Sequence, residues 1–462
     1  MRIDLHHNHP EQDLLPYHQS MPTAAPRKTS PVPRPSIGLA RGTQGALFPS
    51  DHDLRHETSF VSNMQLPVHR WFRYSAGFSA AWVEQLLKES GNPAEMRVLD
   101  PFAGSGTTLL AAQAVGAESV GWESHPFVAR VANAKLAWGA DANLVRQRGN
   151  DLLHRFQPLA LSSEVPPLLT KCYTPEVLAD LLGLRDAILQ SGEDDDVASL
   201  LWLALVSIVR PVSHVGTAQW QYVLPNKRKG RTTGVREAFA DQIETMAADM
   251  EWRQMECPTP PATKLVNGDA RSDDHVLDGW ATHVICSPPY ANNYDYADAT
   301  RLEQTVLGEV SSWGDLKELR DKLMRSCSQH MTRYSPDEAF SDPLLDPIRE
   351  ELQCVYSELD AVRSSHGGKK AYHSMVVAYF HDLAHIWRNL RRSCARGSEV
   401  CFVIGDSAPY GVYVPVERWL GELAVSVGFS SWTFEKVRDR NVKWKNRKHR
   451  VPLHEGRLWV QG

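Results

Sequence analysis

The chain has 462 residues, which is more than one ordinary domain needs, so we expect a catalytic domain with insertions or a second module. Hydrophobic residues make up 42% of the sequence, enough for a buried core, and no apolar run is long enough to cross a membrane. The net charge of −5 does not single out a nucleic-acid binder, and seven cysteines without Cys-x-x-Cys spacing predict neither a disulfide framework nor a zinc site.

The chain begins with a segment that has no periodicity. Residues 1–55 are rich in Pro, His and Ser and are predicted to form a disordered tail. Three histidines there, His6, His7 and His9, could bind stray metal. The start of the chain lacks a secretory pattern and carries acids, which predicts a cytoplasmic protein.

A strand, a glycine turn and a helix are predicted within residues 56–150. The apolar run 96–99 leads into the turn 100–108, after which alanines and leucines have helical spacing. This arrangement presents backbone N–H groups and a helix N-terminus to a ligand in a doubly wound sheet. Gly104 and Gly106 allow a ligand to approach closely. No lysine follows the second glycine, which excludes a Walker phosphate loop.

An acid at the start of this turn indicates the kind of ligand. Asp100 would repel a pyrophosphate but suits an ammonium group. A second apolar run ends at Glu123, where an acid after the second strand binds ribose hydroxyls. A nucleoside with an ammonium group describes S-adenosylmethionine, which we predict as the cofactor. The structural alternatives are a helix cap for Asp100 and an exposed strand-end carboxylate for Glu123.

Residues 151–262 are predicted to be a helical insertion and a candidate for target recognition. Residues 175–189 have an amphipathic pattern, and 197–209 form a largely buried helix with acids at its start. A third helix is expected over 234–252.

A Ser-Pro-Pro-Tyr turn marks residues 263–303 as the catalytic half. Such a turn suits methylation of an amino nitrogen whose lone pair is delocalised into a ring, because acceptors must pull that lone pair toward the methyl group. The Ser287 hydroxyl and the Pro288 carbonyl are the candidate acceptors. Pro288 and Pro289 stiffen the turn, and Tyr290 would stack on the ring.

The remaining residues are predicted to complete the fold. Residues 304–374 form a helical or looped insertion, the second candidate for target recognition, with a Pro/Asp-rich turn over 335–347. Residues 375–462 supply a final helix, a buried strand, a basic segment and a last antiparallel strand. Cys286 lies on the strand side of the catalytic turn, so it is predicted to be a buried apolar residue and not a nucleophile.

Together the two motifs resemble those of the DNA amino-methyltransferases, and the serine that opens the turn resembles the cytosine-N4 group. The resemblance spans roughly residues 60–140 and 263–303, with weaker agreement from 375 to the end. It implies a Rossmann-like doubly wound sheet with helical insertions. The residues that match the family's cofactor site are Phe78, Ser79, Asp100, Phe102, Gly104, Gly106, Glu123 and, as an adenine contact, Asp269.

The resemblance implies a site-specific DNA methyltransferase that acts by direct transfer. Cytosine would be flipped out of the duplex, and its N4 would attack the sulfonium methyl without a metal or a covalent enzyme intermediate. Double-stranded DNA is the implied partner, and a cognate restriction endonuclease is a further candidate. A long insertion between the motifs departs from the simplest members with this order, and we expect 212–236 and parts of 304–374 to face the DNA.

Two clusters of cations are the candidate phosphate contacts. Their alternative interpretation is a solvated basic face. One cluster is Lys227, Arg228, Lys229 and Arg231, and the other is Lys436, Arg438, Arg440, Lys443, Lys445, Arg447, Lys448 and Arg450.

Three other functions remain open on the sequence. The same turn geometry allows adenine-N6 methylation, which the serine disfavours. An RNA guanine-amino methyltransferase has a similar pocket but usually carries an RNA-capturing module, and residues 1–55 show no sign of one. A non-catalytic DNA-reading subunit should have a decayed catalytic turn, whereas this turn is intact.

Overall fold

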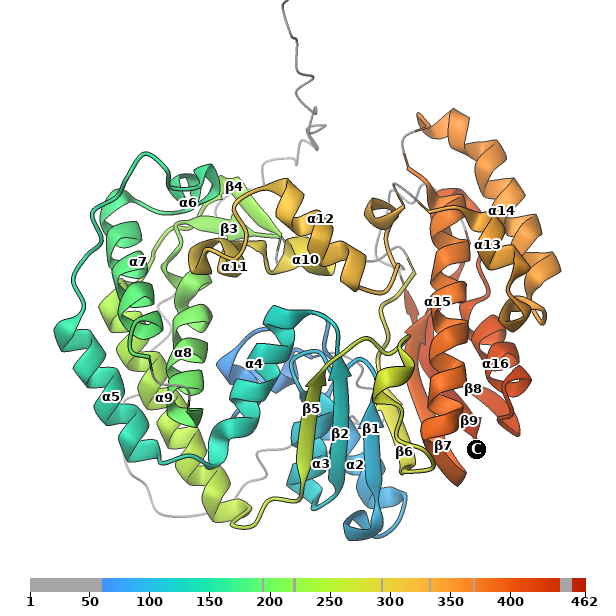
Figure 1. Cartoon of the computed structure of the whole chain (residues 1–462), viewed down its shortest axis with the longest axis horizontal. Helices are drawn as coiled ribbons and strands as arrows, with labels where there is room; N and C mark the ends of the chain where they lie inside the picture. The colour runs from blue at the N-terminus through green and yellow to red at the C-terminus, as the bar shows by residue number, and fades with distance from the viewer. Residues whose placement is uncertain are drawn as a thin grey trace, which may run out of the picture. The chain divides into compact units, whose positions relative to one another are not determined.

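A seven-stranded sheet forms the centre of the fold in a computed structural model that describes residues 60–192, 195–218, 222–291, 294–331, 334–368, 370–440 and 451–462 (Figure 1). The predicted tail lies outside the described residues. β5, β2, β1, β6 and β7 run parallel, and β9 pairs antiparallel with β7 and β8, which confirms the predicted doubly wound α/β sheet. In spatial order the strands are β5 (Thr263–Asn267), β2 (Glu118–Glu123), β1 (Arg97–Asp100), β6 (Ala281–Cys286), β7 (Cys394–Gly405), β9 (Leu453–Gln461) and β8 (Ser431–Arg440).

Helices cover both faces of this sheet, because alternate strand residues point to opposite sides. Ile285 packs with α2 and α3, whereas its neighbours Val284 and Cys286 pack with α15 and α16. α3 and α4 share a smaller core with Leu265 of β5. The bounds are α2 (Ala80–Glu89), α3 (Thr107–Val115), α4 (Pro126–Leu136), α15 (Tyr372–Ser393) and α16 (Val416–Ser426).

The first insertion is largely helical, with α7, α8 and α9 where the sequence predicts helices. Asp195 caps α8 by accepting a hydrogen bond from the Ala198 amide at 2.8 Å, which explains the acids at its start. α5 crosses the expected boundary at residue 150, and its Gly149 packs on Ile243 of α9. A small β3–β4 sheet was not predicted. These elements are α5 (Ala142–Arg155), α6 (Pro167–Cys172), α7 (Pro175–Leu189), α8 (Asp196–Val212), β3 (Val215–Thr217), β4 (Val223–Arg228) and α9 (Val235–Glu256).

The second insertion divides between two neighbours. α11 packs against α6, α7 and α8, whereas α13 and α14 pack against α15 (Figure 1). The Pro/Asp-rich segment expected to be a turn contains the short helix α13, because Pro336 occupies a first-turn position that needs no N–H. None of the described helices is long and apolar enough to span a bilayer. The elements are α10 (Tyr296–Ala299), α11 (Arg301–Leu307), α12 (Trp313–Lys322), α13 (Pro336–Ser341) and α14 (Arg349–Arg363).

A buried carboxylate ties the first insertion to the segment that precedes α2. Asp249 of α9 accepts hydrogen bonds from the Val68 amide at 3.2 Å and the Trp71 indole N–H at 2.9 Å. Arg70 donates to the same oxygen at 2.9 Å. A carboxylate with this many donors is well satisfied in the core, and its loss would leave donors without an acceptor.

We predict that Asp249→Ala destabilises the protein. The Val68 amide and the Trp71 indole would lose their acceptor, and each buried orphan donor costs about 1–3 kcal/mol. The free energy of unfolding, measured by urea denaturation, should fall by about 3 kcal/mol. Asp241→Ala, at an exposed position on the same helix, is the matched control and should change it by less than about 0.5 kcal/mol. Equal stability of the two variants would contradict this role of Asp249.

Candidate active site

The turn between β1 and α3 needs glycine at two positions. Gly104 has φ +53° and Gly106 has φ +86°, both in the left-handed region that side chains rarely adopt. A Cβ on Gly104 would lie 3.2 Å from Cε1 of Tyr74, which covers the turn. Backbone conformation alone therefore accounts for both glycines, and the predicted close approach of a ligand is an additional reason for them.

Asp100, at the end of β1, keeps one carboxylate oxygen unpaired. Its Oδ1 accepts a hydrogen bond from the Phe102 amide at 2.9 Å, whereas its buried Oδ2 has no partner among the described residues. Burial raises the pKa of Asp100 to about 7, against the smaller opposing effects of the Thr108 hydroxyl and the Phe102 amide. α3 begins after Gly106 without a side-chain cap, so Asp100 does not cap this helix. An unpaired buried oxygen fits a cationic ligand.

Glu123 joins the end of β2 to the glycine turn. Its Oε2 accepts from the Gly104 amide at 2.8 Å and its Oε1 from the His125 amide at 2.7 Å. Burial raises the pKa of Glu123 to about 7. Glu123 is therefore not the exposed carboxylate of the alternative interpretation. A carboxylate offers about four lone-pair sites, so it can still accept from ribose hydroxyls.

Three of the residues predicted to bind the cofactor, Phe78, Ser79 and Phe102, make contacts within the protein. The fully buried Ser79 caps α2, accepting from the Trp82 amide at 3.3 Å. Phe78 packs on Trp82 with ring centroids 5.9 Å apart. Phe102 is half-buried beside the core that α15 covers. Contact of Phe78, Ser79 and Phe102 with the cofactor stays a prediction.

Asp269 forms an ion pair with Arg271. It follows β5, and its Oδ2 accepts from Nε of Arg271 at 2.9 Å. Arg271 also donates to the buried Asp382 of α15 at 3.0 Å. The predicted adenine contact must therefore share this carboxylate with Arg271.

The catalytic turn lies beside the glycine turn. Parallel pairing of β1 with β6 puts their carboxyl ends at one edge of the sheet, where ligands bind in such folds. The Ser287 hydroxyl donates to the Val403 carbonyl at 3.2 Å. Because its hydrogen is committed, the hydroxyl presents lone pairs to any ligand in the turn.

Arg440 covers the ring of Tyr290. Its guanidinium carbon lies 5.3 Å from the ring centroid, and Nη1 donates to the Asp406 carbonyl at 2.7 Å. The sequence placed Arg440 in a basic cluster for phosphate and did not predict this contact, because strand β8 brings it to the turn from far along the chain.

A cluster of tyrosines adjoins the catalytic turn. Tyr294 packs on Tyr296 at 4.6 Å and on Tyr222 of the first insertion at 5.8 Å between ring centroids. The Tyr222 hydroxyl accepts from the Asp295 amide at 2.8 Å. The first insertion therefore contacts the segment that follows the turn. The signal for Tyr222 in the sequence is the aromatic stretch Trp220-Gln221-Tyr222, which precedes the cation cluster at Lys227.

Cys286 is fully buried in the core that α15 covers, as predicted. Burial raises the pKa of its thiol well above the usual range, which disfavours a thiolate.

Known proteins are similar to this chain over most of its length. Residues 48–134 match the family model for DNA methylase of the N6 and N4 types. The chain is 26% identical over 425 residues to type II methyltransferase M.BsoBI of Geobacillus stearothermophilus, with 81% of each chain covered. It is 24% identical over 420 residues to type II methyltransferase M.AvaI of Nostoc sp., covering 81% of this chain and 82% of the relative. Residues 48–134 are thus similar to the DNA amino-methyltransferases, and the relatives that are similar over most of the chain are type II methyltransferases.

A further relative matches a shorter segment of the chain at higher identity. Type II methyltransferase M.MjaII of Methanocaldococcus jannaschii is 34% identical over 89 residues, 19% of this chain and 17% of the relative. Members of the DNA amino-methyltransferase family use S-adenosylmethionine as methyl donor. The unpaired oxygen of Asp100 fits its ammonium group, and Glu123 fits its ribose.

We predict that cofactor affinity falls as pH falls through 7. Asp100 and Glu123 have raised pKa values of about 7, and a cationic ligand binds their ionised forms. Affinity should therefore be full at about pH 8 and above and fall as pH decreases through 7, by roughly 10-fold per acid between pH 7.5 and 6. Calorimetry in buffers of different ionisation enthalpy should also detect proton release at pH 6.5. Asp100→Asn should bind weakly at both pH values, and a flat profile in the unaltered protein would contradict the prediction.

Proposed function

We propose that this protein is a site-specific DNA methyltransferase that transfers the methyl group of S-adenosylmethionine to N4 of cytosine. The observation that carries the proposal is the intact Ser287-Pro288-Pro289-Tyr290 turn, on the strand adjacent to the glycine turn. Adenine-N6 is the closest alternative, and the serine is the reason we favour cytosine. The intact turn also supports an enzyme over a non-catalytic DNA-reading subunit.

The chemistry requires acceptors for the two hydrogens of an amino group. With its hydrogen directed to the Val403 carbonyl, the Ser287 hydroxyl is oriented to accept one of them. The Pro288 carbonyl is the second acceptor, and Tyr290 is the stacking surface for the flipped base. Holding the amino nitrogen this way directs its lone pair at the sulfonium methyl, so positioning supplies most of the acceleration. Cys286 takes no part, since its thiol is buried and protonated.

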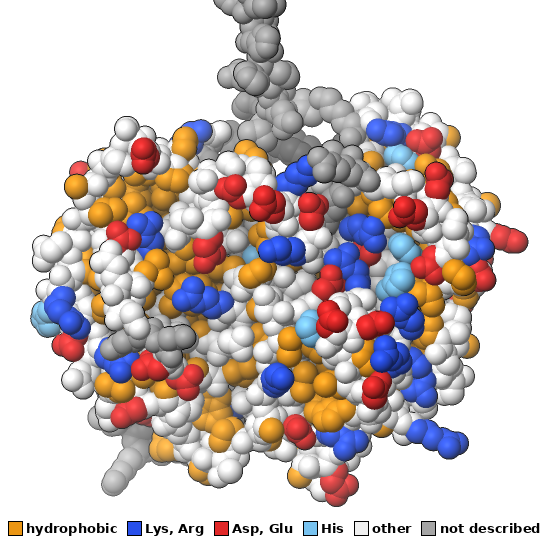
Figure 2. Space-filling model, viewed as in Figure 1, with side chains coloured by type: hydrophobic (Ala, Val, Ile, Leu, Met, Phe, Trp, Pro, Cys, Tyr) orange, Lys and Arg blue, Asp and Glu red, His pale blue; other side chains and the backbone are white. Residues whose placement is uncertain are grey.

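Residues around β4 are our candidate DNA surface. Lys227, Arg228 and Arg231 are exposed there, close in sequence to Tyr222, which contacts the segment after the catalytic turn. Lys229 instead turns inward and donates to the Arg210 carbonyl at 2.6 Å. Acidic and basic side chains are mixed over the face that Figure 2 shows, so this face presents no continuous basic surface to DNA.

The C-terminal cation cluster offers less support within the described residues. Lys436 pairs with Asp439 at 2.6 Å and Arg438 with Glu455 at 2.8 Å. The lysines and arginines from 441 to 450 lie outside the described residues, so their phosphate contacts stay a prediction.

We also propose which segments read the DNA target, where the enzyme acts and which partner it has. We assign target recognition to the insertions 151–262 and 304–374. We place the enzyme in the cytoplasm, and we propose a cognate restriction endonuclease because the relatives named above are type II methyltransferases.

We predict that Ser287→Ala and Tyr290→Ala strongly reduce methyl transfer without weakening cofactor binding. Loss of one preorganised acceptor commonly costs on the order of 100-fold in rate. Loss of the stacking ring removes roughly 1–3 kcal/mol of base binding. Labelled cofactor, duplex DNA and nucleoside digestion measure the rate and identify the methylated base.

Conservative variants test the same assignment. Tyr290→Phe keeps the ring and should retain most activity, and Cys286→Ser should do the same because no thiolate attacks the base. N6-methyladenine as the product would refute the cytosine assignment. A covalent complex of the enzyme with fluorocytosine DNA would refute direct transfer.

We predict that neutralising Lys227, Arg228 and Arg231 to alanine weakens binding to all DNA sequences alike. Each lost phosphate contact reduces the slope of log K against log salt by about 0.9, so the triple variant should lose about 2 to 3 units of slope. Fluorescence anisotropy over a salt series measures it. The control is the double variant Lys88→Ala with Lys264→Ala, at exposed positions on α2 and on the edge strand β5. A loss confined to one sequence with an unchanged slope would assign these residues to base reading.

A further inference from the structure

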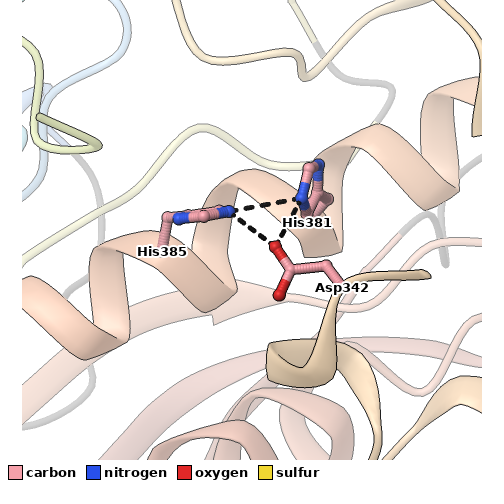
Figure 3. Close-up of side chains that lie close together, drawn as sticks. All are labelled: Asp342, His381 and His385. Carbon is pink, nitrogen blue, oxygen red and sulfur yellow. Dashed lines mark hydrogen bonds and ion pairs between the residues drawn. The ribbon is translucent and has the colours of Figure 1, made fainter. Parts of the chain in front are cut away.

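Three potential metal ligands converge outside the active site. His381 and His385 lie one turn apart on α15, and Asp342 stands at the turn between α13 and the 3-10 segment Pro343–Leu345 (Figure 3). The Nε2 atoms of His381 and His385 lie 3.0 and 2.9 Å from Oδ2 of Asp342. The two Nε2 atoms are 3.2 Å apart. All three donor atoms therefore point at one another.

These spacings are close to those of a metal site. In a tetrahedral zinc site with bonds of about 2.0–2.1 Å, the ligand atoms are roughly 3.3 Å apart. The observed triangle needs only a small expansion to place one ion at bonding distance from all three atoms. A set of two imidazoles and one carboxylate also suits divalent transition metals better than it suits calcium or magnesium.

The surroundings hold the carboxylate in place and leave the donors accessible. Oδ1 of Asp342 accepts from the Leu344 amide at 2.9 Å, which fixes the carboxylate and leaves Oδ2 for the histidines. The side chains of Asp342, His381 and His385 are 18, 17 and 28% exposed, so an ion can reach them from solvent.

A second group with similar composition lacks this geometry. In Asp406, Glu417 and His454, the two ring nitrogens of the histidine face different acids. Nδ1 lies 3.0 Å from Asp406 and Nε2 lies 3.5 Å from Glu417. Opposite sides of one ring cannot bind the same ion, so His454 bridges two carboxylates and provides a matched control.

We propose that Asp342, His381 and His385 bind one divalent transition-metal ion of the zinc type, with a fourth position open to water. The sequence predicted no metal site because that expectation rested on the cysteines. The ion would join the α13 segment of the second insertion to α15. On the adjacent residue of α15, Asp382 accepts from the Arg325 amide at 2.8 Å and so holds the same insertion by a second contact. The proposal does not depend on the enzyme's substrate.

The test titrates metal into the full chain. His6, His7 and His9 are replaced by glutamine to remove stray binding, and the protein is stripped with a chelator. We expect one equivalent of Co²⁺ to give the visible absorption of a low-coordinate ion and Zn²⁺ to displace it. His381→Gln, His385→Gln and Asp342→Asn should each weaken binding by more than about 100-fold, because even outer-shell changes cost 10–100-fold. His454→Gln should leave it unchanged.

Three further measurements make the outcome decisive. Circular dichroism and cofactor affinity verify that each variant is folded. Zinc should slow proteolysis near residues 335–345 in the parent protein and have no effect in Asp342→Asn. No stoichiometric binding in the parent, or binding lost only in His454→Gln, would overturn the proposal.

Discussion

The parallel pairing of β1 with β6 is the constraint on which the site depends. Leu99 lies opposite Val284, so the two strands end within a few residues of each other. The glycine turn and the Ser-Pro-Pro-Tyr turn are almost two hundred residues apart in the chain, and this register alone makes them neighbours. Both strands are buried on both faces, so a shift of one residue would send core side chains to the wrong layer. Packing of the core therefore fixes the position of the glycine turn relative to the Ser-Pro-Pro-Tyr turn, where we propose that methyl donor and acceptor meet.

Electrostatics at this edge favour a cation before any ligand arrives. Asp100 and Glu123 are held in a buried setting in which their charged forms are costly. Glu123 is compensated by two backbone amides, whereas Asp100 has only one. The uncompensated oxygen is thus created by the fold and is available to a positively charged group. An apolar ligand would gain nothing there.

What the sequence predicts well is local. The run from strand to glycine turn to helix, the buried Cys286 and the helices of the first insertion all depend on residues within a dozen positions, and the fold confirms them. The sequence alone could not predict contacts that tertiary structure creates. Arg440 reaches Tyr290 through β8, Asp269 is paired through a neighbouring arginine with α15, and Asp342 meets His385 across an insertion. The β3–β4 sheet was missed because its strands are short and one follows directly from a helix.

The contact between Arg440 and Tyr290 affects how much a base would gain by stacking on the tyrosine ring. A bare tyrosine ring would be covered by water, and a base that stacked on it would gain the full benefit of releasing that water. Here a planar cation already lies on the ring, so a base on that face replaces one stacking partner with another. A guanidinium displaced by such a base would also give up its hydrogen bond to the Asp406 carbonyl. The cost of losing both contacts of Arg440 would therefore be subtracted from what the base gains by stacking on Tyr290.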